Sequence, residues 1–149
     1  MTTLELLYNE ALENDISVFD YPITKKAACL HNDGFKYIAL NKSKIESSAE
    51  EKTLLAEELG HFATGSLYFV EATCNTPLAK LNREKCEAKA KRYAINKTIS
   101  PKKIQEAINS GCVNEYEVAE FCEVPIDFLR DTFEYYKRKG ISFERHSRQ

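Results

Sequence analysis

Apolar residues recur along this chain at the two spacings that mark helices and strands. The helical spacing, with capping residues before several runs and Gly after several others, predicts helices over 4–14, 48–64, 81–97, 101–110, 115–122 and 126–139. Two strand-like runs, 27–31 and 35–40, flank the turn residues Asp33 and Gly34, which indicates a β-hairpin. Residues 16–22 predict a short extended link. The pattern therefore predicts an α+β protein, mostly helical, with a small sheet.

Composition agrees with a globular protein and narrows the choice of partner. Of 149 residues, 43% are hydrophobic and 30% are charged, and the formal net charge of −2 gives no general attraction to nucleic acid or acidic lipid. No apolar run approaches the ~20 residues that a bilayer span needs, and the acidic N-terminus lacks the features of a signal peptide. The five cysteines include no CxxC pair, which fits free thiols in a reducing compartment. We therefore expect a cytoplasmic protein with no membrane partner.

The segment with the most specific chemistry is Glu57-Glu58-x-x-His61. On a helix Glu57 and His61 lie one turn apart on one face, about 40° apart around the axis. This is the spacing of the zinc-protease pattern HExxH, in which residues i and i+4 bind the metal and the Glu between them acts on metal-bound water. Carboxylate oxygen also binds zinc. We predict Glu57 and His61 as metal ligands and Glu58 as the general base; the alternative is a solvated acidic helix face.

Two further residues support a metal site on this helix. Gly60 lowers helix stability by roughly 1 kcal/mol relative to Ala, so its presence indicates the close approach of another element. Glu87 shares a face of the next predicted helix with the small residue Ala90, and a carboxylate on such an apolar face is unfavourable unless it is paired or binds a metal. Glu87 is therefore the predicted third ligand, with Glu84 as the alternative.

Together these segments resemble the ImmA/IrrE family of zinc metallopeptidases, particularly its variants from prophages and mobile elements of Gram-positive bacteria. The resemblance covers residues 15–140 approximately and is carried by three motifs in order: Tyr37-Ile-Ala-Leu-Asn, Leu55-Ala-Glu-Glu-Leu-Gly-His-Phe-Ala-Thr-Gly and Glu87-Ala-Lys-Ala-Lys-Arg-Tyr-Ala. It implies a minimal zincin-like metallopeptidase core over 1–98 and a C-terminal helical extension over 99–149 packed on that core.

The resemblance also implies a function and the roles of individual residues. Members of the family characterised for function cleave a helix-turn-helix repressor, usually encoded nearby, and so release its target genes. By position, Glu57, His61 and Glu87 would bind Zn²⁺ and Glu58 would be the general base. The sequence does not identify the residue that stabilises the oxyanion, for which Tyr68 is only a weak candidate. We therefore expect a metal-dependent endopeptidase whose substrate is a repressor protein.

The chain departs from the family pattern at Glu57, where His is more frequent. Two carboxylates and one imidazole neutralise a divalent ion more fully, which leaves its bound water less acidic. They also shift affinity from Zn²⁺ toward harder ions such as Mn²⁺. The alternative function is therefore a catalytically weak or inactive protein of the same fold that regulates a partner by binding it.

The C-terminal segment allows a third interpretation, a DNA-binding regulator. Residues 117–129 resemble a helix-turn-helix, with two short helices about a turn at Val124 and Pro125. Between Lys102 and Tyr136, however, three basic residues stand against eight acidic ones, the wrong sign for binding phosphates. This balance favours a structural or partner-docking role. The acidic segment and the basic helix 81–97 would offer charged faces to a protein substrate, or would neutralise each other within the fold.

Overall fold

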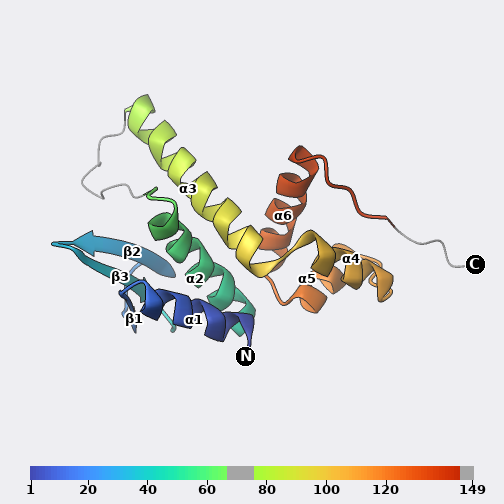
Figure 1. Cartoon of the computed structure of the whole chain (residues 1–149), viewed down its shortest axis with the longest axis horizontal. Coiled ribbons are helices and arrows are strands. Elements are labelled where there is room, and N and C mark those ends of the chain that lie inside the picture. The colour runs from blue at the N-terminus through green and yellow to red at the C-terminus, as the bar shows by residue number, and fades with distance from the viewer. Residues whose placement is uncertain (67–75, 145–149) are drawn as a thin grey trace, which may run out of the picture. The chain divides into compact units, whose positions relative to one another are not determined.

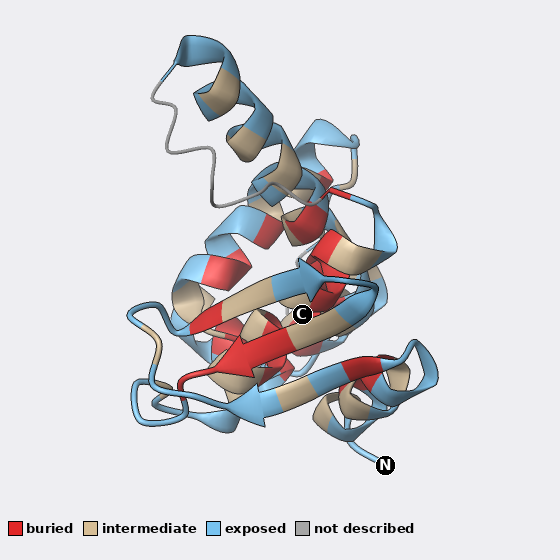
Figure 2. Cartoon of the chain, turned by 90° about the vertical axis from the view of Figure 1, so that its left-hand side faces the viewer, coloured by how far each residue is buried: buried red, intermediate tan, exposed pale blue. Residues whose placement is uncertain are grey.

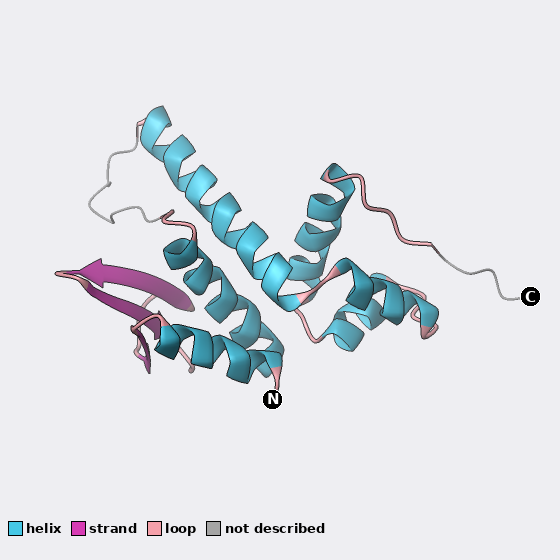
Figure 3. Ribbon diagram, in the orientation of Figure 1, coloured by secondary structure: helices cyan, strands magenta, loops and turns pink. Residues whose placement is uncertain are grey.

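The computed structural model describes residues 1–66 and 76–144, which form helices and one small sheet (Figures 1 and 3). In chain order the elements are α1 (Thr3–Glu13), β1 (Ile16–Asp20), β2 (Ala27–Asn32), β3 (Phe35–Leu40), α2 (Ser48–Ala63), α3 (Pro77–Thr98), α4 (Pro101–Asn109), α5 (Glu115–Cys122) and α6 (Ile126–Arg138). This composition confirms the predicted α+β class, mostly helical with a small sheet.

The chain divides into two compact units, Met1–Ala94 and Ile95–Gln149. The division falls within α3, and the domain boundary expected from the sequence, between 98 and 99, lies at the end of the same helix. The packing of the C-terminal extension on the core stays a prediction. Within the described ranges, no helix combines the length and apolar character that crossing a bilayer requires.

The sheet of the first unit has three strands in the order β1-β3-β2. The Asp33-Gly34 turn joins β2 and β3 as an antiparallel hairpin, and both turn residues have the positive φ that this turn requires. The central strand β3 buries Ile38 and Leu40 completely, and Figure 2 shows buried positions along the end of this strand. The hairpin prediction is therefore confirmed, and β2 lies at an edge of the sheet order.

Residues 16–22 differ from the extended link that the sequence predicts. Residues 16–20 form the strand β1, which pairs in parallel with β3 from Ile16 opposite Lys36 to Asp20 opposite Leu40. Ile16 is buried whereas Phe19 is partly exposed, so the strand alternates between the two faces of the sheet. A five-residue strand has too few alternating positions to separate it from a link without knowledge of its partner.

Helices α1 and α2 cover one face of the sheet (Figure 1). Ser47 caps α2, because its side chain accepts a hydrogen bond from the backbone N–H of Glu50 at 3.1 Å, as the sequence predicts. On its inner face α2 buries Leu55, Ala56 and Leu59. This packing fixes the rotation of α2 about its axis, and therefore fixes which residues of Glu57-Glu58-x-x-His61 face away from the sheet.

Helix α3 begins four residues earlier than predicted. The backbone N–H of Ala79 donates to the side-chain oxygen of Thr76 at 3.2 Å, and Pro77 occupies the first helical position. The additional first turn exposes Leu78 to solvent, so it has no apolar face from which a sequence pattern could detect it.

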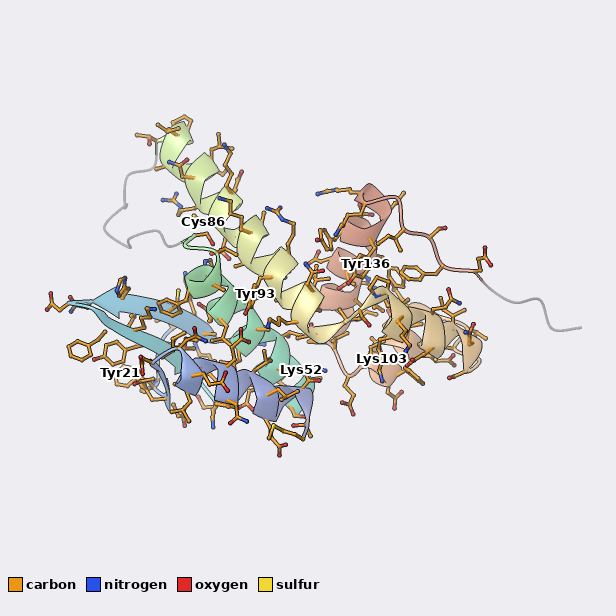
Figure 4. All side chains as sticks on the ribbon, in the orientation of Figure 1. Tyr21, Lys52, Cys86, Tyr93, Lys103 and Tyr136 are labelled. Carbon is orange, nitrogen blue, oxygen red and sulfur yellow. The ribbon has the colours of Figure 1, made fainter. Side chains whose placement is uncertain are left out.

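The second unit contains α4, α5 and α6 within residues 95–144. Ser100 and Asn114 cap α4 and α5 as predicted, and Gly111 follows α4 with a positive φ. Tyr136 is 1% exposed, and its hydroxyl donates to the carbonyl oxygen of Ile99 at 2.6 Å (Figure 4). This hydrogen bond joins α6 to the chain just before α4.

Candidate functional site

Gly60 is a point of close approach between α2 and α3. A Cβ atom at Gly60 would lie 2.8 Å from the carbonyl oxygen of Ala90 and 3.1 Å from the Cβ of Tyr93. Both distances are shorter than an ordinary van der Waals contact, so only glycine allows the helices to come this near. The sequence-based expectation that Gly60 marks the close approach of another element is confirmed.

Two polar pairs cross between α2 and α3 beside this contact. Glu57 Oε1 lies 3.0 Å from Lys91 Nζ, and His61 Nε2 lies 3.6 Å from Glu87 Oε1. In each helix the two residues are four apart, and their order is reversed between the helices. The helices therefore run in opposite directions here, and one turn of α2 faces one turn of α3.

A pocket of about 180 Å³ lies beside the His61–Glu87 pair, between α2, α3 and the segment that includes the edge strand β2. Its volume is small compared with pockets that bind drug-sized ligands, and suits an ion with a few waters or part of one side chain. The lining combines a cation, small residues of β2 and groups able to ligate a metal: Lys25, Ala27, Ala28, Cys29, Glu58, His61 and Glu87.

His61 is the most buried of these groups, with 4% of its surface exposed. Its Nδ1 lies 2.9 Å from the carbonyl oxygen of Ser66, which can only accept a hydrogen bond. Nδ1 must therefore carry a proton, and in the neutral ring Nε2 presents its lone pair toward Glu87. Burial lowers the pKa of His61, but the neighbouring Glu87 carboxylate, the Ser66 carbonyl and the charge of Glu58 together outweigh burial and leave the pKa raised.

Glu58 lines the same pocket, near the thiol of Cys29 on β2. Burial raises the pKa of the Glu58 carboxyl; the charge of His61 and the Cys29 thiol oppose this shift without cancelling it. The pKa of the Cys29 thiol is also raised, first by burial and then by the charge of Glu58. A carboxylate whose proton affinity is increased in this way suits acid–base chemistry near neutral pH.

The sequence-predicted ligands are thus divided between two positions. His61 and Glu87 line the pocket together with Glu58, whereas Glu57 contacts Lys91 and is not among the lining residues. The expectation that Glu87 lies on a buried face is wrong, because its side chain is 51% exposed. Ala90 and Ala94 are buried as that face requires, but Glu87 lies a turn or more earlier, at the open side of the pocket.

Two residues of the site were not identified from the sequence, Cys29 and Lys91. Cys29 was interpreted only as a small apolar residue or free thiol, and its contact with Glu58 depends on the pairing of β2 into the sheet. Lys91 follows Glu87 by four residues. This is the spacing between Glu57 and His61, and it could have indicated the second cross-helix pair. Tyr68 lies outside the described residues, as does Cys74.

The donor atoms of this site fit a divalent metal ion in their chemistry. One imidazole nitrogen is oriented by a backbone carbonyl on the opposite side of its ring, as metal-binding histidines commonly are, and carboxylates lie next to it. Over residues 1–66 and 76–144, no three His, Cys, Asp or Glu side chains are already gathered as a ligand set. Glu57 would have to leave Lys91 to complete the predicted one.

Comparison with known proteins identifies no relative of this chain. No protein-family model matches it, and neither the curated proteins nor the solved structures contain a significant match.

Proposed function

We propose that this protein is a metal-dependent endopeptidase with a minimal zincin-like core. The observation that carries the proposal is the convergence of Glu58, His61 and Glu87 on one pocket, from two different helices and beside an edge strand. A solvated acidic helix face would not be expected to direct a carboxylate and an imidazole together into a partly enclosed pocket.

Glu57, His61 and Glu87 would hold the metal, either Zn²⁺ or a harder divalent ion such as Mn²⁺. When bound, the ion would supply Lewis acidity that polarises the scissile carbonyl and makes water a better nucleophile. The Ser66 carbonyl fixes the His61 tautomer in which Nε2 is the ligating atom. Glu87, half exposed at the open side of the pocket, leaves the entry side accessible to a peptide.

Glu58 would serve as the general base. Its raised pKa favours accepting a proton from water and later returning it to the leaving amine, because the group then changes protonation state closer to neutral pH. The Cys29 thiol lies beside the Glu58 carboxylate in the pocket and would restrain its orientation. The edge strand β2, which carries Cys29, brings backbone groups to the same pocket.

The proposed substrate is a helix-turn-helix repressor protein in the cytoplasm, encoded near this protein's gene, whose cleavage releases phage or mobile-element genes. A pocket of about 180 Å³ has little room for deep subsites, so most of the recognition would come from the surface of a folded partner. The resemblance of the sequence motifs to the ImmA/IrrE family supports this substrate class, and the small pocket agrees with it.

The test is incubation of the purified protein with the neighbouring repressor, in the presence of Zn²⁺ or Mn²⁺ and in the presence of a chelator. We expect cleavage that requires the metal and is abolished in Glu58→Gln, with metal content reduced in His61→Ala. Glu13→Gln, which changes an exposed carboxylate of α1 that does not line the pocket, is the matched control and should cleave normally. Cleavage that continues in the presence of the chelator would contradict the peptidase proposal. So would a lack of cleavage with both Zn²⁺ and Mn²⁺.

One observation favours a second function, binding of a partner without turnover. Glu57 is already engaged by Lys91, so the proposed ligand set is incomplete in this conformation. A regulatory protein of this kind would bind the repressor and change its DNA affinity, and Glu58→Gln would leave that effect intact. Measuring repressor–operator binding with the wild-type protein and with Glu58→Gln separates the two functions.

A further inference from the structure

The Glu57–Lys91 ion pair is the feature of the site that the proposed peptidase chemistry does not use. Lys91 Nζ lies 3.0 Å from Glu57 Oε1, a distance typical of a charge-assisted hydrogen bond. The side chains retain 33% and 22% exposure, respectively, so each can turn toward water without opening the fold. The pair is therefore close, and it is also able to separate.

The position of the pair relates it to the pocket. Glu57 is the neighbour of Glu58 and lies one helical turn from His61, but the pocket is lined by Glu58 and His61 and not by Glu57. The Gly60–Ala90 contact fixes the two helices against each other at this level. Lys91 is thereby held opposite Glu57 by the same packing that holds Glu87 opposite His61.

We propose that Lys91 is an internal cation that competes with the divalent metal for Glu57 and thereby sets the metal affinity of the site. This inference rests on the proposed function, because it assumes that Glu57 is a ligand. With metal absent, Lys91 neutralises Glu57; with metal bound, Glu57 turns to the ion and the Lys91 ammonium moves into solvent. Lys91 is a positioning residue and takes no part in the reaction itself.

Two physical effects act in the same direction. The metal must displace an existing ion pair before Glu57 can become a ligand, and this displacement weakens apparent binding. The Lys91 charge also remains near the bound ion, and two cations close together repel each other, most strongly where the surroundings are partly buried. Removal of the Lys91 charge should therefore strengthen metal binding.

The experiment is an isothermal titration calorimetry measurement in which the metal-free protein is titrated with Zn²⁺ alone or with Mn²⁺ alone. We expect Lys91→Met to lower the dissociation constant about three- to tenfold, the scale of a partly exposed ion pair. Lys91→Arg keeps the charge and should bind as the wild type does. Lys89→Met removes the same charge from an exposed position of α3 and is the matched control, with little expected effect.

A double substitution tests whether Lys91 acts through Glu57. In the Glu57→Gln background, Lys91→Met should strengthen metal binding clearly less than it does in the wild-type background, because the carboxylate for which lysine and metal compete is gone and only the repulsion between the Lys91 charge and the ion remains. If the wild type binds no metal but Lys91→Met does, the inference is supported. Measurable binding by the wild type with equal or weaker binding by Lys91→Met overturns the inference and leaves the proposed peptidase standing. If neither protein binds metal, both proposals fail.

Discussion

Gly60→Ala tests the contact on which the whole site depends. The new methyl group would meet the carbonyl oxygen of Ala90 at 2.8 Å and its Cα at 3.0 Å, and backbone atoms cannot turn aside as a flexible side chain can. Overpacking of this kind costs about 1–3 kcal/mol. Alanine returns about 0.8–1.0 kcal/mol of helix propensity. The net expectation is a loss of about 0–2 kcal/mol in the free energy of unfolding.

Urea denaturation followed by circular dichroism measures this loss, with Ala88→Gly as the matched control. Ala88 is exposed on α3, so its replacement reports the Ala–Gly difference in propensity without a packing term, a loss of about 1 kcal/mol. Gly60→Ala should also weaken metal binding, because moving α3 away separates His61 from Glu87. A Gly60→Ala variant that is more stable than the wild type by the full ~1 kcal/mol of helix propensity would refute the close approach of the two helices.

Three further predictions concern single groups. Burial raises the pKa of the Cys29 thiol, so iodoacetamide should alkylate it at pH 8 far more slowly than an unfolded peptide containing it, as mass spectrometry would measure. Hydrogen bonds from Arg130 lower the pKa of Glu115. The stability that this ion pair contributes is therefore present at neutral pH and is lost as the pH falls through the lowered pKa. Arg130→Gln should return the pKa of Glu115, measured by NMR, toward its ordinary value. Tyr136→Phe leaves the Ile99 carbonyl without its donor and should lower the unfolding free energy by ~1–3 kcal/mol in a urea titration.

Much of the secondary structure follows from local sequence because its signals are local. Ser47, Ser100 and Asn114 each accept a backbone hydrogen bond at the start of the predicted helix, and Asp33-Gly34 turns the hairpin. β1 was predicted only as an extended link, because its pairing is with a strand fifteen or more residues away along the chain. The first turn of α3 was missed for a related reason, since its Leu78 is exposed and gives no apolar pattern.

Helical periodicity predicts which residues of the candidate site share a face of their helix. The i, i+4 spacing places Glu57 and His61 on one face of α2, and the unfavourable glycine between them indicated a close neighbour, now identified as Ala90. Periodicity cannot say how far a side chain lies from the protein surface. Glu87 was therefore expected on a buried face, whereas it is half exposed at the open side of the pocket.

The pair between Glu57 and Lys91 explains how the chain accommodates its departure from the HExxH pattern. With His at this position, a lysine from α3 would face a neutral ring and would have no charge to neutralise. Glu57 adds a negative charge next to Glu58, and Lys91 compensates it while no metal is bound. The same compensation must be undone before Glu57 can serve as a ligand. The proposed effect of this carboxylate and the lysine opposite it is a site that requires a higher metal concentration to fill.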